Sequence, residues 1–233
     1  MVGGEEARYI VKVLRLRLGD GVLLFDGSGK EYGGEIEKVS KDQVAVRIMG
    51  ESCPLVESPL ELILIQGIPK SEKMDLIVKG TTELGVSGIW PFFSSRTIPR
   101  WKDSTLSKKV SHWEKIALSA AQQSGRTRVP EVRAPLPFED MVNEVDNLKD
   151  SFLKIVLWEE ERERKIKDVL RGMPQPAGIC FLIGPEGGFS PDEINCFKRK
   201  GCIPIHLGNR ILRTETAGIT LLSIIQYEWG DLG

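Results

Sequence analysis

Three glycines, a proline and a glutamate are concentrated in one short segment, Ile183-Gly184-Pro185-Glu186-Gly187-Gly188-Phe189-Ser190. An apolar run precedes it and a helix start follows it. Glycines have no Cβ, so the backbone of such a loop can approach a ligand closely. The free N–H groups of a following helix attract polar ligand atoms. Tight turn geometry explains the glycines equally well, and the segment matches neither G-x-G-x-x-G nor G-x-x-x-x-G-K-[ST], so no dinucleotide or P-loop site is predicted.

A second segment, Leu207-Gly208-Asn209-Arg210-Ile211-Leu212-Arg213-Thr214-Glu215-Thr216, is unusually polar and charged for a short connection. Arg213 offers a cation and Glu215 a carboxylate, although the two could also form an exposed ion pair. In open α/β sheets, ligands bind at the carboxyl ends of the strands. Because both segments follow predicted strands, they are expected at the same end of one sheet, and this favours a binding site there.

The elements that must position these segments alternate between apolar runs and helical periods from Leu60 onward. Five strand–helix alternations predict a mostly parallel sheet that helices cover on both faces. The expected strands are 60–66, 89–93, 153–158, 179–183 and 203–207. The helices expected from periodicity are 104–124, 138–145, 164–171 and 214–229.

Two further helices are predicted from their ends. Ser190, Pro191 and Glu193 can occupy the N-cap, N1 and N3 positions of a capping box, so a helix is expected to begin there. Ser71 is expected to cap a helix that Gly85 ends.

The first part of the chain has a different pattern, with short strands broken by turns. The proline-rich stretch 52–59 is unsuited to a regular element and is interpreted as a linker. Two domains are therefore predicted, a β-rich unit at 1–58 and an α/β unit at 59–233. The strands expected in the first unit are 22–25, 32–39 and 43–48.

The composition is that of a globular protein, with 233 residues, 41% hydrophobic, 28% charged and a net charge of −1. This balance gives no general reason to expect a polyanionic partner. No apolar stretch reaches the roughly 18 residues of a membrane span, and a cytosolic protein is expected. Two histidines and four cysteines without a C-x-x-C pair offer no convincing zinc set, so no metal is expected. The cysteines, all expected to be reduced, are Cys53, Cys180, Cys196 and Cys202.

Positive charge is concentrated between residues 96 and 133, where nine basic residues stand against three acidic ones. Such a patch can contact RNA phosphates, and Trp101 adds an aromatic ring. A solvated helix face explains the same charges. The basic residues are Arg96, Arg100, Lys102, Lys108, Lys109, Lys115, Arg126, Arg128 and Arg133.

Several motifs occur in order along nearly the whole chain. They are Val13-Leu14-Arg15-Leu16 with Gly19-Asp20, Pro69-Lys70, Thr82-Glu83-Leu84-Gly85-Val86, Gln122-Gln123-Ser124-Gly125-Arg126, Gly184 to Ser190 with Glu193, Leu207-Gly208, and Ile211 to Ala217. Together they resemble the motifs of the RsmE family, the small-subunit (16S) ribosomal RNA uridine N3-methyltransferases. One stretch departs from the family, which often has a histidine where this chain reads Ala7-Arg8-Tyr9.

The resemblance implies an N-terminal PUA-like β-barrel that binds RNA. It also implies a C-terminal SPOUT domain whose chain passes through a trefoil knot to form an S-adenosylmethionine site. Two further implications are a homodimer packed through the knotted region and 16S ribosomal RNA, within the small ribosomal subunit, as the partner. Neither a membrane nor a metal ion is implied.

The cofactor is expected among three loops that leave neighbouring strand ends, and the resemblance implies the same places. The cofactor residues expected there are Leu157, Trp158, Glu159, Ile183, Gly184, Pro185, Glu186, Gly187, Gly188, Leu207, Gly208, Ile211, Leu212 and Thr216. The residues expected to contact RNA are Arg15, Lys70, Arg96, Gln123, Arg126 and Arg128.

Methylation at uridine N3 requires that the N3 proton leaves or that negative charge on the base is stabilised, so an acceptor or a cation is needed near the ring. Arg213 is the expected ligand of a uracil carbonyl or a flanking phosphate, because its fork suits oxygen acceptors. Glu215 is the expected proton acceptor, although a carboxylate also stabilises a helix start.

Two other functions fit the same motifs. One is a non-catalytic RNA-binding or ribosome-assembly factor with the same fold, which would need no methyl donor. The other is a related methyltransferase that acts on transfer RNA or another base position, since cofactor loops reveal little about the nucleotide.

Overall fold

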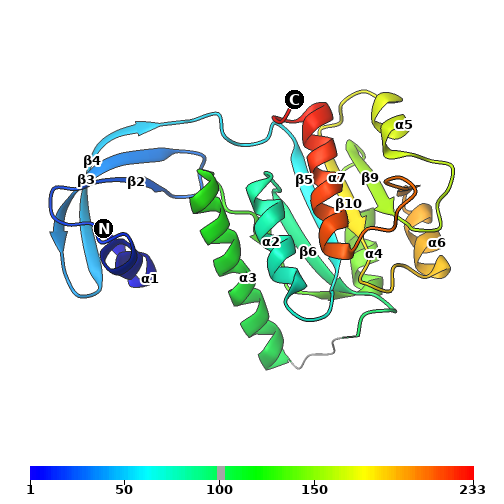
Figure 1. The fold of residues 1–233 in the computed structure, drawn as a ribbon, viewed down its shortest axis with the longest axis horizontal. Coiled ribbons are helices and arrows are strands. Elements are labelled where there is room, and N and C mark those ends of the chain that lie inside the picture. Colours follow the sequence, from blue (N-terminus) through cyan, green and yellow to red (C-terminus); the bar gives the residue numbers. More distant parts are fainter. Residues whose placement is uncertain (99–102) are drawn as a thin grey trace. The chain divides into compact units, whose positions relative to one another are not determined.

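An antiparallel sheet and a parallel sheet build the protein, one in each of two units, Met1–Glu57 and Ser58–Gly233. The computed structural model describes residues 1–98 and 103–233. Figure 1 shows the first unit in blue to cyan and the second in cyan to red.

The N-terminal unit is a four-stranded antiparallel sheet in the order β1-β4-β3-β2. Two register shifts, at Gly33/Gly34 and at Ile36/Lys38, bend the long strand pair. The three strands expected here are confirmed, with longer bounds for β4. The strands are β1 (Val2–Gly3), β2 (Gly21–Phe25), β3 (Glu31–Val39) and β4 (Gln43–Ser52).

A helical segment that the sequence did not predict packs on this sheet. Helix α1 (Gly4–Arg8) continues into a π-helical turn (Tyr9–Val13). Its inward residues Ala7 and Ile10 join Ile36 in a small buried cluster. The segment contains too few helical periods to stand out in the sequence, so its contacts with the sheet determine its conformation.

The C-terminal unit contains a seven-stranded sheet in the order β11-β9-β10-β5-β6-β7, with β8 also paired to β6. Every strand pair described in it is parallel. The five predicted strands are confirmed, whereas the two-residue strands β7 and β8 are too short to show a pattern. The strands are β5 (Glu61–Gly67), β6 (Gly88–Phe93), β7 (Glu131–Val132), β8 (Leu136–Pro137), β9 (Phe152–Leu157), β10 (Gly178–Ile183) and β11 (Ile203–Ile205).

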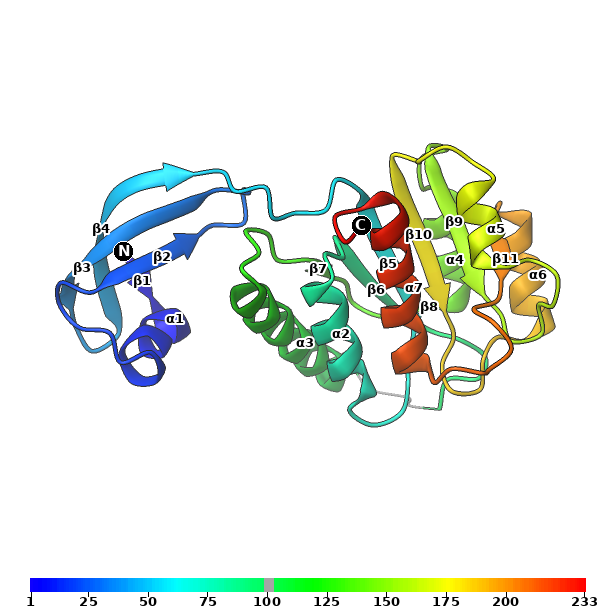
Figure 2. The ribbon, with the colours of Figure 1, turned by 45° about the horizontal axis from the view of Figure 1, so that its top comes forward.

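Helices cover both faces of this sheet, as predicted (Figure 2). On one face, alternate strand residues such as Leu64 and Phe181 pack against α2, α3, α5 and α7. On the other face, Ile65 and Leu182 pack with residues of α4 and α6. The helices are α2 (Lys73–Glu83), α3 (Asp103–Ser124), α4 (Phe138–Asp146), α5 (Ile166–Arg171), α6 (Pro191–Arg199) and α7 (Thr214–Trp229).

The helix starts explain one success and one error of the sequence analysis. The capping box of α6 is present, with the Ser190 hydroxyl accepting from Glu193 N–H and the Glu193 carboxylate accepting from Ser190 N–H. The prediction for Ser71 is wrong, because Glu72 is the N-cap of α2. Ser71 has a positive φ of 58°, so it forms the turn before the helix instead.

The strand registers bring the carboxyl ends of three strands together. Ile183 at the end of β10 pairs with Gln66 of β5, and Ile205 at the end of β11 pairs with Leu157 of β9. The loops that follow β9, β10 and β11 therefore leave the same edge of the sheet. Within the described ranges, no helix is long and apolar enough to cross a membrane.

Candidate active site

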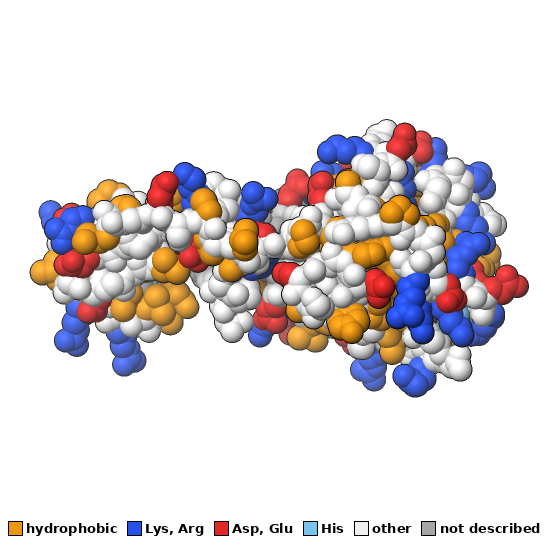
Figure 3. All heavy atoms as spheres, turned by 90° about the horizontal axis from the view of Figure 1, so that it is seen from above, with side chains coloured by type: hydrophobic (Ala, Val, Ile, Leu, Met, Phe, Trp, Pro, Cys, Tyr) orange, Lys and Arg blue, Asp and Glu red, His pale blue; other side chains and the backbone are white. Residues whose placement is uncertain are grey.

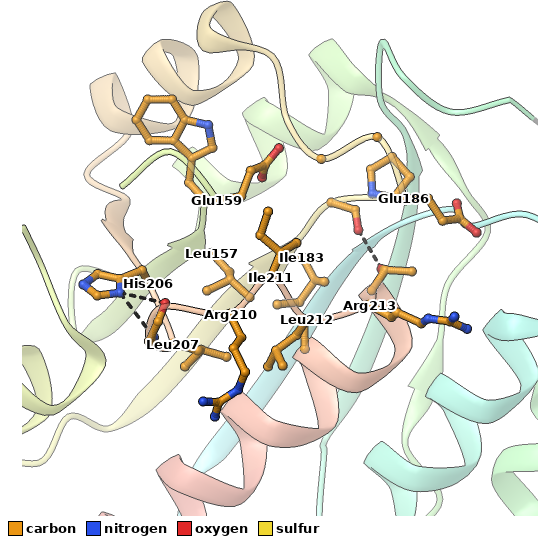
Figure 4. Close-up of a pocket in the computed structure, with 18 of the residues that line it drawn as sticks. Leu157, Glu159, Ile183, Glu186, His206, Leu207, Arg210, Ile211, Leu212 and Arg213 are labelled. Atoms are coloured by element: carbon orange, nitrogen blue, oxygen red, sulfur yellow. Dashed lines mark hydrogen bonds between the residues drawn. The ribbon is translucent and has the colours of Figure 1, made fainter. Parts of the chain in front are cut away.

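A pocket of about 480 Å³ lies where the loops after β9, β10 and β11 meet. Figure 4 shows the apolar side chains of Leu157, Ile183, Ile211 and Leu212 gathered at its centre, with His206 on one side. All the residues expected to bind a cofactor line this pocket except Thr216. The exposed Thr216 lies in the first turn of α7, where its N–H donates to the Arg213 carbonyl at 2.9 Å.

Close backbone packing fixes the first part of the glycine loop, Gly184–Gly188. A Cβ on Gly67, at the end of β5, would lie 2.7 Å from Pro185 Cδ and 2.9 Å from Pro185 N. A Cβ on Gly184 would lie 3.0 Å from the Gly188 carbonyl carbon. Only residues without a side chain allow these backbones to approach so closely.

Buried polar groups join this loop to the start of α7. The Thr214 hydroxyl donates to the Gly184 carbonyl at 2.7 Å and accepts from the Gln66 amide at 3.0 Å. Thr214 and Gln66 are both buried. One hydrogen-bond network therefore holds together the ends of β5 and β10 and the start of α7. The sequence of either loop alone does not reveal this network.

Glu186 anchors the middle of the glycine loop to α2. Its carboxylate accepts from Lys70 N–H at 3.1 Å and pairs with Lys73 Nζ at 2.8 Å. Partial burial raises the pKa of Glu186, but the hydrogen bond from Lys73, the backbone N–H groups of Glu186 and Lys70, and the Lys73 charge together outweigh burial and hold the pKa below its ordinary value. Glu186 is therefore ionised at neutral pH and holds the glycine loop against Lys70 and Lys73.

The far side of the glycine loop is held by the segment after β6. The buried Glu193 accepts from Ser95 N–H at 2.7 Å, in addition to its capping-box bond. Arg96 donates to the Gly187 carbonyl at 2.6 Å. Arg96 was expected to contact RNA. Its guanidinium instead helps to hold the glycine loop, although the side chain remains exposed.

The second loop, between β11 and α7, has fewer internal contacts. His206 Nδ1 accepts from Gly208 N–H at 3.2 Å, and the Arg213 carbonyl accepts from the N–H groups of Thr216 and Ala217 in the first turn of α7. Ile211 is 80% exposed, and Arg210 and Arg213 are exposed as well. No hydrogen bond or ion pair to a described residue is recorded for either guanidinium, so both are available to a ligand outside the chain.

Glu215 does not line the pocket. Its carboxylate lies beside Lys73, with Oε2 at 3.6 Å from Nζ and buried without a hydrogen bond. Lys73 itself lines the pocket, although the sequence did not single it out as a site residue. The other lining residues that it missed are Arg162, His206, Asn209, Arg210, Thr214 and Ala217.

The residues expected to contact RNA lie in different environments. Arg126 is 5% exposed, and its guanidinium donates to the carbonyls of Thr82 and Val86 at 2.9 Å. Its assignment is therefore corrected from RNA contact to holding the C-terminal end of α2. Arg15, with a positive φ of 58°, and Lys70, Gln123 and Arg128 are exposed.

Basic side chains form separate groups on the surface, interspersed with acidic ones, rather than one continuous patch on the face shown in Figure 3. The densest group on this face lies over the α5/α6 edge of the C-terminal unit. Arg100, Trp101 and Lys102, which the sequence analysis placed in its basic region, lie outside the described residues. Among those that are described, no group of three or more His, Cys, Asp or Glu could hold a metal ion.

Comparison with known protein families shows that this parallel sheet with a pocket at its carboxyl edge, joined to a small antiparallel sheet, is that of an RNA methyltransferase. The RNA methyltransferase domain family matches residues 56–226, and the RNA methyltransferase PUA domain family matches residues 2–49. Ribosomal RNA small subunit methyltransferase E from Bacillus subtilis is 32% identical over 97% of this chain and 89% of its own. The chain belongs to this family, RsmE, as its motifs indicated.

Two solved structures extend the likeness to three dimensions. Ribosomal RNA small subunit methyltransferase E from Neisseria gonorrhoeae, bound to S-adenosyl methionine, has a TM-score of 0.89 and 32% identity, covering 100% of this chain and 92% of its own. A protein from Legionella pneumophila, in complex with the cofactor SAM, has a TM-score of 0.88 and 37% identity, covering 97% and 90%.

The pocket of this chain fits such a cofactor. Its apolar centre suits an adenine ring, and glycines on two sides expose backbone groups for polar contacts. Trp158 Nε1, on the wall, is buried without a hydrogen-bond partner. The Glu159 carboxylate lies so close to Gly188 that a Cβ there would collide with it. Together these residues offer an apolar slot, an unpaired indole N–H and the Glu159 carboxylate.

Proposed function

We propose that this protein transfers a methyl group from S-adenosylmethionine to N3 of a specific uridine in 16S ribosomal RNA. The observation that carries the proposal is the pocket at three adjacent strand ends, lined by nearly every residue expected from the motifs. When bound, S-adenosylmethionine supplies a methyl group on a positively charged sulfur, which takes back the bonding electrons. The residues of the chain must bind and orient both molecules, and they must accept the N3 proton or stabilise the negative charge that its loss leaves on the base.

The two loops divide this work. We propose that the glycine loop and the loop after β9 hold the cofactor, with Leu157, Ile183 and Leu212 against the adenine ring. Arg213, at the exposed N-cap of α7, orients the uracil or a flanking phosphate. Glu215 as the proton acceptor stays a prediction, since its carboxylate lies behind Lys73 rather than on the wall.

We also propose that the C-terminal unit is a SPOUT domain with a trefoil knot. The support is topological. β11 lies beyond β9 at the edge of the sheet, whereas Thr214 is bonded to the end of β10. The segment 207–213 therefore crosses the ends of β9 and β10 before α7 begins.

The RNA partner is expected to contact both units. We propose that the N-terminal unit, residues 1–58, is a PUA-like barrel that binds RNA, with Arg15 at its surface, and that residues 59–233 carry the catalytic site. In the second unit, Lys70, Arg96, Gln123 and Arg128 supply exposed polar groups for RNA.

A homodimer packed through the knotted region is proposed as the active assembly. Helices α2 and α7 lie side by side and expose large apolar residues, with Leu76 58% and Tyr227 68% exposed. Light scattering of the purified protein is expected to give twice the mass of one chain.

The test of the function uses small ribosomal subunits from a strain that lacks this gene. Purified protein and S-adenosylmethionine are added, and the ribosomal RNA is digested and mapped by mass spectrometry. One methyl group on the base of a single uridine is the expected result. An unmodified 16S RNA, or a methyl group on a base other than uracil, would contradict the proposal.

A further inference from the structure

Among the described residues, Lys73 is the one pocket-lining cationic side chain that forms ion pairs with two carboxylates. It is the first residue of α2, and its side chain is 29% exposed. Glu186, from the glycine loop, lies 2.8 Å from its Nζ, and Glu215, from α7, lies 3.6 Å away. A lysine fixed between three elements in this way is positioned more firmly than a solvated surface lysine.

The Lys73 ammonium has more N–H donors than the two neighbouring carboxylates accept. A lysine ammonium has three N–H groups. Glu186 Oε1 accepts one of them, whereas Glu215 Oε2 is too far away for a hydrogen bond and contributes only its charge. At least one N–H group of Lys73, on the pocket wall, is therefore not bonded to Glu186 or Glu215.

Methylation at N3 creates a requirement for such a donor. When uridine releases its N3 proton to water, the negative charge spreads onto the two carbonyl oxygens that flank N3. A cation beside one of these oxygens favours the deprotonated base, as an opposite charge favours the charged form of any acid. Donors placed where charge develops are among the strongest catalytic contributions.

We propose that Lys73 is a catalytic residue that donates a hydrogen bond to a uracil carbonyl oxygen next to N3 and stabilises the charge that develops there. This inference rests on the proposed function, because it assigns the cation which the reaction needs. Glu186 and Glu215 hold the ammonium in place.

The surroundings keep Lys73 positively charged throughout the working pH range. The hydrogen bond to Glu186 raises its pKa, burial lowers it, and the charges of Glu186 and Glu215 raise it further, so that the net shift is upward. These two carboxylates are the charged groups recorded within ion-pair distance of Nζ in the described part of the chain. Lys73 therefore acts as a permanent cation and not as a proton acceptor.

The test compares Lys73→Met, which keeps the aliphatic stem, with Lys73→Arg, which keeps the charge. Lys79→Met is the matched control, since Lys79 is exposed on the same helix. Single-turnover methyl transfer to small subunits from the strain lacking this gene is measured from pH 6 to pH 10 in all variants. Calorimetry with S-adenosylhomocysteine, the product of the methyl donor, measures cofactor binding separately.

At neutral pH, Lys73→Met is expected to lower the transfer rate by roughly 100-fold or more. The deficit should shrink as the pH rises, because hydroxide then removes the N3 proton without help from the cation. Lys73→Arg should recover a substantial part of the rate, and affinity for S-adenosylhomocysteine should change by less than about threefold.

Three results would overturn the inference: a Lys73→Met rate close to that of the wild type, a deficit that is equal at every pH, or a deficit explained by lost cofactor affinity. A wild-type protein that transfers no methyl group would instead overturn the proposed function. The two failures are therefore distinguishable.

Discussion

Two of the three loops that form the pocket are held very differently. The glycine loop is fixed at its start by Gly67, in its middle by Glu186 and at its far side by Arg96. The loop before α7 has one histidine contact and a helix cap, and its Arg210 and Ile211 side chains are exposed. Both loops follow parallel strands of one sheet, so the strand ends alone do not determine rigidity.

This difference suggests a division between two ligands. A small cofactor of constant shape is bound best by a preformed site, because little conformational freedom is lost on binding. A large RNA substrate benefits from exposed cationic side chains that can adjust to its phosphates. Changes to the glycine loop should therefore affect stability and cofactor binding, whereas changes to the exposed arginines of the second loop should affect RNA binding.

The largest effect is expected for Gly67→Ala. The added methyl group would meet the backbone of Pro185, which cannot move away as a flexible side chain could. The free energy of unfolding should fall by about 2–3 kcal/mol, as measured by urea denaturation. Calorimetry should also show weaker binding of S-adenosylhomocysteine, because the collision displaces the glycine loop.

Gly21→Ala is the control for that variant. A Cβ on Gly21, in β2, would meet no atom within 4 Å, and its φ is not positive. Its stability should remain within about 0.5 kcal/mol of the wild type. If Gly67→Ala behaved like Gly21→Ala, the glycine loop would not be preformed.

A smaller effect is expected for Arg210→Ala and Arg213→Ala in the second loop. Each should weaken binding to small-subunit RNA by roughly threefold to tenfold and reduce the salt slope by about one. S-adenosylhomocysteine affinity should stay unchanged. Arg199→Ala, on exposed α6, removes one charge away from the pocket and serves as the control. Equal losses for all three variants would show a general charge effect and no specific role for this loop.

The smallest effect is expected on the folding stability of the protein at acid pH. Because the folded-state pKa of Glu186 is lowered from its ordinary value of 4.5, its ionised form stabilises the protein above that pH. This contribution is lost as the pH falls through the folded-state value. Glu186→Gln should therefore lose less stability than the wild type between pH 6 and pH 3.5, by about 0.5 kcal/mol. Parallel acid curves for the two proteins would contradict the Lys73–Glu186 contact.

Much of the fold could be predicted because local signals agreed with it. The bounds of α7 follow from its apolar stripe, and α6 follows from a capping box whose four groups are adjacent in sequence. Ser71 shows the limit, since the same residue type can cap a helix or form a turn with positive φ. The π-helical turn 9–13 could not be predicted, because it depends on contacts with the sheet.

The site shows the same division. Residues next to the glycine and arginine motifs could be predicted from strand ends, whereas Lys73 could not, since its partners Glu186 and Glu215 are distant in the chain. Arg126 was misjudged for a related reason. A run of basic residues resembles a surface patch, and only the fold reveals that one guanidinium is buried against carbonyls at the end of α2 and just beyond it.

A crystal structure of the protein with S-adenosylhomocysteine decides whether the pocket is a preformed cofactor site. The ligand is expected between the glycine loop and the segment 207–213, with its adenine against Leu157, Ile183 and Leu212. Gly184–Gly188 should move little on binding. A ligand found outside this pocket, or a glycine loop rebuilt around it, would show that no preformed cofactor site exists there.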